Sequence, residues 1–546
     1  ELLNNTIRAS TFNRNGARAG GAILISSKGT TINGSNFYYN SAIFGGAVYI
    51  NHTDNNVIDD SLFEHNTASE SGGALSIEFS DNILVNNASM NWNNATVGGA
   101  IYVYPSDDVT VNNSHFVQNG AYNNVADILP CGGAVYWFGD NGIIDNSEFY
   151  NNRVNIENWS NTHGGAVYFH GNNALINNSK FTYNWAYNKD NFSDGGALYL
   201  DGNYATVENS LFEDNMAIAY GGAIYLEGYA GSVYNSTFNR NRVGTEGGAL
   251  YVNSEDFVIN KSTFTKNNAT YLGGAVALDE PGTIDNSTFT ENTANKGGAI
   301  YWEASSSFIY DTNLTSNAAD YGGALYLGGN SAESTIFNCI FLDNHAKFNG
   351  GAIDCNASKM FLSNTTFDSN YAQYGSALCR EINAKGGSGA NNTFINNHAY
   401  IAGAALGWMG SLNIKITNYT FINNSADVGG GAIYVSPDSI NCSIITSNFE
   451  NNYVTNKTST WDGNKFYWTA WDGETMSFTL AITTDPNLVN KTFIGVDTIY
   501  YAPNEELGRE LMCIGGAVNC LAANATITDS NFTNNSARLG GALYVG

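Results

Sequence analysis

The chain has 546 residues, of which 43% are hydrophobic and 13% aromatic, and its formal net charge is −27. Only 22 residues are Lys or Arg and they form no cluster, which excludes nucleic acids and anionic membrane surfaces as natural partners. No apolar run reaches the length that spans a bilayer, so we expect no membrane insertion by this segment. No signal peptide opens the chain.

The chain is built from repeats marked by Gly-Gly-Ala, an aliphatic residue and usually Tyr. The tripeptide begins at Gly20, Gly45, Gly72, Gly98, Gly132, Gly164, Gly195, Gly221, Gly247, Gly273, Gly297, Gly322, Gly350, Gly430, Gly515 and Gly540. Degenerate copies at Gly375 and Gly403 bring the number of units to 18, most of them 24 to 28 residues apart. A fixed period of this length predicts a solenoid, in which each unit buries its apolar face against its neighbours.

A second motif, Phe-x-x-Asn, lies between successive Gly-Gly-Ala motifs, as in Phe37–Asn40 and Phe63–Asn66. The runs beside both motifs are short, alternate with period two and are rich in β-branched and aromatic residues, which is typical of strands. About 25 residues at roughly 3.3 Å each are enough for one three-sided lap. The sequence therefore predicts an all-β fold, a parallel β-helix of about 18 coils, and the general rule for parallel crossovers favours the right-handed form.

The alternation predicts which side chains face the core. Val48, Ile50 and the Phe of each Phe-x-x-Asn should point inward, whereas Tyr49 and its equivalents should form an exposed aromatic ladder. We expect the glycine doublet at a corner that needs positive φ or close packing. The Asn that ends Phe-x-x-Asn is expected at another corner, in the left-handed region and bonded to its neighbour along the stack.

The repeat is interrupted by insertions that all leave from one corner. The stretch from the Asn to the next Gly-Gly, normally 5 or 6 residues, grows to 13, 12 and 11 in three consecutive units and to 63 between Asn452 and Gly515. We therefore divide the chain into a β-helix over 1–452, an insertion over 453–512 and a continued β-helix over 513–546. Insertions on one face of a repeat protein often mark its binding face.

Aromatic residues in these insertions are the candidate ligand-binding residues. They are Tyr122, Trp159, Trp185 and Tyr187 in the three shorter insertions, and Trp461, Trp468 and Trp471 in the long one. Flat aromatic rings beside carboxylates suit sugar rings, and Asp462, Asp472 and Glu474 offer the oxygen ligands that Ca²⁺ prefers. The alternative is that the Trp residues form a small core that packs the insertion onto the rod.

Asn and Cys residues are the candidates for covalent modification, by N-glycosylation and by disulfide formation. The N-glycosylation candidates among the many Asn-x-Ser/Thr triplets are Asn33, Asn51, Asn94, Asn158, Asn191, Asn268, Asn356, Asn456 and Asn490. Cys355 and Cys379 stand at nearly the same phase of adjacent coils, so a disulfide between them is a candidate, although their one-residue offset would place them on opposite faces of a strict strand. Small buried core residues are the alternative for most of the seven Cys.

Nothing in the sequence predicts catalysis. Glycoside hydrolysis needs two carboxylates set across one bond, but the densest acidic pairs, Asp59-Asp60 and Asp107-Asp108, stand where turns are expected. No nucleophile motif, phosphate loop or metal-ligand spacing of His occurs. We therefore expect no enzyme and no cofactor apart from a possible Ca²⁺.

The two motifs together resemble those of chlamydial polymorphic outer-membrane proteins. Combined with Asn-Ser-Thr-Phe and dense glycosylation triplets, the pattern is also similar to adhesin-like surface proteins of methanogenic archaea. The resemblance spans nearly the whole chain except roughly 453–512, and it implies a right-handed β-helix exposed on a cell surface.

We therefore expect an extracellular, glycosylated, adhesin-like or structural rod whose partners are glycans or cell-surface proteins. Two alternatives stay open: a filament subunit joined end to end through uncapped coils, and a carbohydrate-active β-helix enzyme. Because both ends lie inside a repeat without a capping element, we expect either a piece of a longer chain or such end-to-end stacking.

Overall fold

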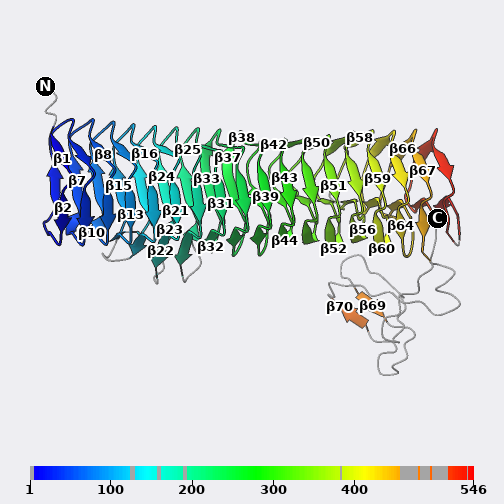
Figure 1. The fold of residues 1–546 in the computed structure, drawn as a ribbon. Coiled ribbons are helices and arrows are strands. Elements are labelled where there is room, and N and C mark those ends of the chain that lie inside the picture. The colour runs from blue at the N-terminus through cyan, green and yellow to red at the C-terminus, as the bar shows by residue number, and fades with distance from the viewer. Residues whose placement is uncertain are drawn as a thin grey trace.

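The structure, a computed structural model, describes residues 5–122, 129–156, 161–188, 193–381, 384–455, 477–479, 492–494, 515–537 and 539–546. The repeats form one long right-handed parallel β-helix, as predicted, with laps stacked along the rod (Figure 1). The described residues contain no helix of the length and apolarity needed to cross a lipid bilayer.

One lap contributes a strand to each of four sheets. In the second lap these are β4 (Thr31–Asn33) in sheet 1, β5 (Asn36–Tyr38) in sheet 2, β6 (Ser41–Phe44) in sheet 3 and β7 (Val48–Asn51) in sheet 4. Sheets 1, 2 and 4 each contain 18 strands and sheet 3 contains 16. The predicted three-sided lap is thus completed by a short fourth side, which lies between Phe-x-x-Asn and Gly-Gly.

The stack keeps one register from the first lap to the last in sheets 1, 2 and 4, whereas the register shifts between some neighbouring strands of sheet 3. It begins with β1 (Thr6–Arg8), β2 (Thr11–Asn13) and β3 (Ile23–Ile25), and it ends with β72 (Thr526–Thr528), β73 (Asn531–Thr533) and β74 (Leu543–Val545). Equivalent residues of consecutive laps lie side by side, so that Val48 pairs with Leu75 and Phe37 with Phe63. Among the described strands, only β69 (Ser477–Thr479) and β70 (Thr492–Ile494) pair antiparallel.

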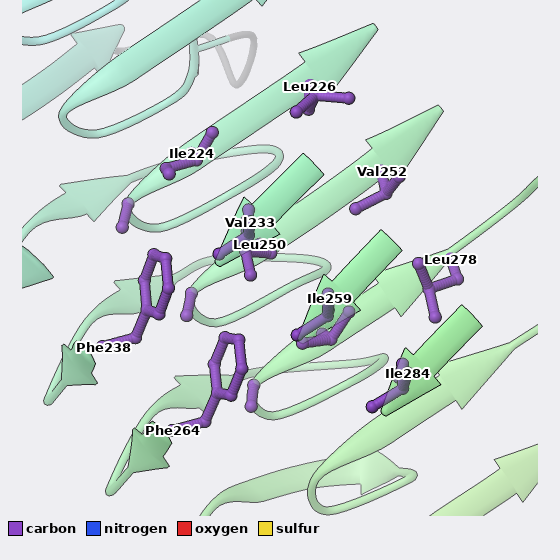
Figure 2. Close-up of a cluster of buried hydrophobic side chains, with 14 of the residues drawn as sticks. Ile224, Leu226, Val233, Phe238, Leu250, Val252, Ile259, Phe264, Leu278 and Ile284 are labelled. Carbon is purple, nitrogen blue, oxygen red and sulfur yellow. The ribbon is translucent and has the colours of Figure 1, made fainter. Parts of the chain in front are cut away.

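The core is a set of like-on-like rows along the rod axis. Figure 2 shows one section, in which the aliphatic residues of sheets 1 and 4 and the Phe of sheet 2 point into the same interior. Phe238 and Phe264 stack with ring centroids 4.7 Å apart and an interplanar angle of 4°. The predicted inward positions are therefore confirmed.

The two glycines of the doublet have different reasons for their identity. The first, for example Gly45 with φ +59°, takes the left-handed conformation that was predicted. At the second, Gly46, a Cβ atom would collide with the backbone carbonyl oxygen of Gly73 in the next lap. Substitution of either glycine therefore disturbs the corner between sheets 3 and 4.

The Asn of Phe-x-x-Asn forms a buried ladder through the rod. Asn215, fully buried, donates from Nδ2 to the Phe181 carbonyl at 2.9 Å and to Asn241 Oδ1 at 3.0 Å, and its own Oδ1 accepts from the backbone and side-chain nitrogens of Asn184 at 3.0 Å. The predicted bond along the stack is confirmed. The predicted left-handed conformation is wrong for the Asn itself, because the residue before it, such as Asp214 with φ +53°, makes the turn.

We predict that Asn215→Ala destabilises the rod by about 2–4 kcal/mol, because it leaves a buried carbonyl and buried N–H groups without partners. Denaturant unfolding or the thermal midpoint measures the loss. Asn531→Ala is the matched control: Asn531 Nδ2 likewise donates to an Asn of the preceding lap, Asn448 Oδ1 at 3.0 Å, but the residue is exposed and lies in β73 outside the left-handed region, so the change should stay within about 0.5 kcal/mol. Equal effects of the two substitutions would contradict a structural role for burial of the ladder.

The candidate disulfide between Cys355 and Cys379 is absent. Both residues are buried free thiols, and the register pairs Cys355 with Arg380 and Cys379 with Asp354. The one-residue offset places the two side chains on opposite faces of sheet 4. Burial raises the pKa of both thiols, which keeps them protonated.

Alkylation of the denatured protein without reductant, followed by mass spectrometry, should therefore find Cys355 and Cys379 as modified thiols. A cross-linked peptide containing both residues would contradict the observed register.

Candidate functional site

Three of the predicted aromatic residues lie close together on the outer face of sheet 3. Tyr122 ends β18 (Gly120–Tyr122), and Trp185 and Tyr187 belong to β27 (Trp185–Asn188), with β22 (Arg153–Ile156) between them. The register aligns Tyr122 with Asn155 and Tyr187, and Arg153 with Trp185. We call Tyr122, Arg153, Asn155, Trp185 and Tyr187 the aromatic platform; each of its strands leads directly into one of the three shorter insertions.

The platform combines rings with polar groups. The Arg153 guanidinium lies 5.9 Å from the Trp185 ring centroid and donates from Nε to Asn151 Oδ1 at 3.0 Å. The rings of Trp185 and Tyr187 meet edge to face with centroids 5.0 Å apart, and Trp185 Nε1 has no protein hydrogen-bond partner. Arg153 and Asn155 are exposed, whereas the three aromatic residues are half-buried.

Tyr122 and Tyr187 are separated by a lap without a ring. Asn155 stands between them, so their Cα atoms are two strand spacings apart, about 9.6 Å. The Tyr122 ring lies over Gly120 of its own strand, and among the described residues no aromatic ring stacks on it. The exposed Asn155 amide therefore separates two aromatic groups, Tyr122 on one side and the Trp185–Tyr187 pair on the other.

A short extra pair of strands connects these laps to sheet 4. In β23 (Thr162–His163) and β28 (Ser193–Asp194), His163 Nδ1 lies 3.1 Å from Asp194 Oδ2. The His163 ring also lies over Tyr199 of sheet 4, with ring centroids 4.4 Å apart.

The predicted tyrosine ladder exists on sheet 4, but it is not exposed. Consecutive rings stack with centroids 4.7 to 5.2 Å apart, and the continuous run comprises Tyr102, Tyr136, Tyr168, Tyr199, Tyr225 and Tyr251. Tyr199 and Tyr251 are only 9% and 8% exposed, because residues just before the glycine doublet, such as His163 and Tyr220, pack over them. The ladder therefore presents ring edges and hydroxyl groups rather than ring faces.

A row of carboxylates runs beside the tyrosines. The hydroxyl of Tyr49 donates to Glu78 Oε2 at 2.7 Å and that of Tyr199 to Glu227 Oε2 at 3.1 Å; Tyr301 donates to Glu303 at 2.6 Å within its own lap. Tyr251 likewise donates to Asp279. Burial and the neighbouring carboxylates raise the pKa of these tyrosines, so they remain protonated donors.

Sequence reasoning missed Arg153, Asn155, the His163–Asp194 pair and the carboxylate row. The row had a visible signal, since Glu78, Glu227, Asp279 and Glu303 all stand two residues after the ladder position. The other groups belong to no motif and come together only through the inter-lap register.

The remaining site predictions lie outside the described residues. They concern Trp159, Trp461, Trp468 and Trp471 as ligand-binding residues and Asp462, Asp472 and Glu474 as calcium ligands. Where the chain is described, no group of three or more His, Cys, Asp or Glu side chains is arranged to hold a metal ion.

The described glycosylation candidates lie in or beside strands rather than in turns. Asn33, Asn51, Asn94 and Asn268 belong to strands, and Asn356 directly follows β53 (Ile353–Cys355). Asn268 is exposed and the other four are half-buried. The candidates Asn158, Asn191, Asn456 and Asn490 lie outside the described residues.

Two family descriptions match parts of the chain. "Right handed beta helix region" matches residues 99–280, and "Chlamydia polymorphic membrane protein repeat" matches residues 286–301, 418–436 and 529–546. The chain therefore carries repeats of the type found in Chlamydia polymorphic membrane proteins. Comparison of the sequence with curated proteins gave no match.

Several solved structures are similar at low identity. Tailspike protein 3 of bacteriophage CBA120 is 12% identical over 76% of this chain and 56% of its own, with a TM-score of 0.32. PfbA, a surface adhesin of Streptococcus pneumoniae, is 13% identical over 71% of this chain and 84% of its own, with a TM-score of 0.29. The A-module of mannuronan C-5 epimerase AlgE4 from Azotobacter vinelandii is 11% identical over 74% and 86%, with a TM-score of 0.23. The chain spans little more than half of the tailspike chain, and at this level of similarity no function transfers.

One carboxyl group near the tyrosine ladder makes stability depend on pH. Burial and the charge of Asp279 raise the pKa of Glu246 from 4.5 to about 7. The pKa of Glu246 is higher in the folded state than in the unfolded state. The contribution of protonated Glu246 to the free energy of unfolding is therefore fully present below pH 4.5 and is lost as pH rises through 7.

We predict that Glu246→Gln reduces the decrease in the free energy of unfolding between pH 4.5 and 8. The reduction should be about 1 kcal/mol after allowance for the partial exposure of the side chain. Thermal unfolding between pH 4.5 and 8 measures it, with the exposed Glu255→Gln as control. Parallel pH profiles of the wild type and Glu246→Gln would contradict the prediction.

Proposed function

We propose that this protein is an adhesin-like rod of a cell surface that binds a glycan at the aromatic platform. The single observation that carries the proposal is the gathering of three aromatic residues around the exposed Arg153 and Asn155 on three consecutive laps of sheet 3. Aromatic surfaces beside exposed N–H donors on one face suit a sugar ring. The matches to repeats of Chlamydia polymorphic membrane proteins support a location at the surface or outer membrane.

Polar groups of the platform suit a hydroxyl-rich ligand. Arg153 and Asn155 supply exposed N–H donors. Sugar binding commonly combines such donors with a few aromatic surfaces that fix the orientation.

The surrounding charge favours neutral over acidic glycans. The protein carries −27, and the tyrosine ladder beside these laps is lined by carboxylates such as Asp194, Asp201 and Glu227. Long-range repulsion lowers the local concentration of a polyanion near such a surface. We therefore propose a ligand built mainly from neutral sugars.

We predict that a glycan array identifies a neutral oligosaccharide and that Asn155→Tyr and Trp185→Ala each weaken its binding about 10-fold or more. Asn155→Tyr replaces the exposed amide at the centre of the platform by a bulky ring, so binding should fall while the stacked rod keeps its thermal midpoint. The control is Tyr204→Ala, an exposed tyrosine on the corner between sheets 4 and 1, which should bind like wild type.

Two outcomes would contradict the proposal. Unchanged binding by Asn155→Tyr would place the ligand elsewhere on the rod. Release of shorter sugars from the bound glycan would instead indicate a carbohydrate-active enzyme.

A further inference from the structure

A buried arginine breaks the core pattern of sheet 4. Arg380 ends β57 (Leu378–Arg380) at an inward position, aligned with Cys355 in the lap before it and Trp408 in the lap after it. It is 3% exposed. Elsewhere this position holds residues such as Ile50, Leu226 and Val252.

The guanidinium lacks a counter-charge. Its Nη2 donates to the Gly386 carbonyl at 2.7 Å, its Nε has no hydrogen-bond partner, and it forms no ion pair with any described residue. Burial raises the pKa of the nearby groups Cys355, Tyr419 and Cys442, so they are protonated and uncharged. A buried cation in this state is strongly unfavourable unless something neutralises it.

Two further departures from the repeat occur at the same place. Sheet 1 places Gly389 in the inward row between Leu362 and Ile416, where other laps have an aliphatic side chain. Tyr419 stands where the next lap has Ser447, and its hydroxyl occupies the space that a Gly389 side chain would fill. Because Gly389 has no side chain, the Tyr419 hydroxyl can occupy this space in the interior.

These residues line a cavity with room for about one water molecule. Arg380 and Tyr419 are the polar side chains that reach this cavity from inside the rod, and Leu378 and Trp408 close its apolar side. Ser388 and Lys415 also border it, but they are exposed and alternate with the inward Gly389 and Ile416, so their side chains point away from the cavity.

We propose that this cavity binds a single halide ion, chloride under ordinary conditions, between the Arg380 guanidinium and the Tyr419 hydroxyl. A halide accepts N–H and O–H hydrogen bonds and supplies the missing negative charge, whereas phosphate or a carboxylate is too large for the space. Chloride is larger than water, so the lining side chains must move slightly to admit it. A water molecule would fit without such movement but would leave the arginine charge uncompensated.

The thermal midpoint of the intact protein tests the proposal. At constant ionic strength, replacing gluconate by chloride or bromide should raise the midpoint in a saturable manner, because the halide binds only the folded state. Arg380→Met should abolish the dependence. Arg240→Met should keep it, because Arg240 lies on the outer surface in ion pairs with Glu213 and Asp214.

A second measurement does not depend on the variants folding. Bromide-soaked crystals of the wild-type protein should show an anomalous peak beside Arg380 Nε. No peak at that position, or an identical anion dependence in wild type and Arg380→Met, would overturn the proposal.

Discussion

Hydrogen bonding between laps in exact register is the constraint on which the whole rod depends. Each strand is only two to six residues long, so no strand is stable alone, and its backbone groups are paired only if the next lap presents the same pattern at the same height. The corners are the weak points of this arrangement, because the backbone there leaves the regular hydrogen bonding between strands. The buried Asn row stabilises the corner after sheet 2, because one side-chain amide donates both to a Phe carbonyl of the preceding lap and to the Asn Oδ1 of the following lap. The glycine doublet forms the corner between sheets 3 and 4, because its first residue adopts the left-handed conformation and its second allows close backbone contact with the next lap.

The same constraint produces the rows of like residues. Parallel in-register pairing places a residue beside its equivalent one lap away, so any favourable self-contact is repeated along the axis. Phe rings stack on Phe rings inside, and tyrosines stack on tyrosines outside. A stack of this kind covers ring faces, however, and a tyrosine inside it offers a ligand little more than its hydroxyl. The proposed glycan site accordingly lies outside the stack, on sheet 3, where Asn155 stands between Tyr122 and Tyr187.

The periodicity of the sequence was sufficient to predict the fold, the inward residues and the ladders, because all of them follow from a lap of fixed length. It was not sufficient where a contact depends on a residue that carries no motif. The exposure of the tyrosines was predicted wrongly because His163 and Tyr220, which precede the glycine doublet without belonging to it, pack over the ladder. The left-handed corner was assigned to Asn rather than to the residue before it, since alternation alone does not show which of two adjacent residues makes the turn. Arg153 and Asn155 were missed because their neighbours in space are 32 or 33 residues away, across insertions that break the regular spacing.

Because the same core position recurs in every lap, a residue that differs from its equivalents is easily recognised, and Arg380 is such a residue. In a core where other laps present residues such as Ile50, Leu226 or Val252 at the same position, a charged residue has an obvious apolar alternative that needs no compensating charge. Arg380 is therefore informative in a way that a buried arginine in an irregular core is not. Gly389 and Tyr419 strengthen this reading, because each alone would create a void or an overlap, whereas together they exchange an aliphatic side chain for a hydroxyl beside the guanidinium. Three coordinated departures at one point of the stack are better explained by selection for a polar site than by independent drift of three core positions.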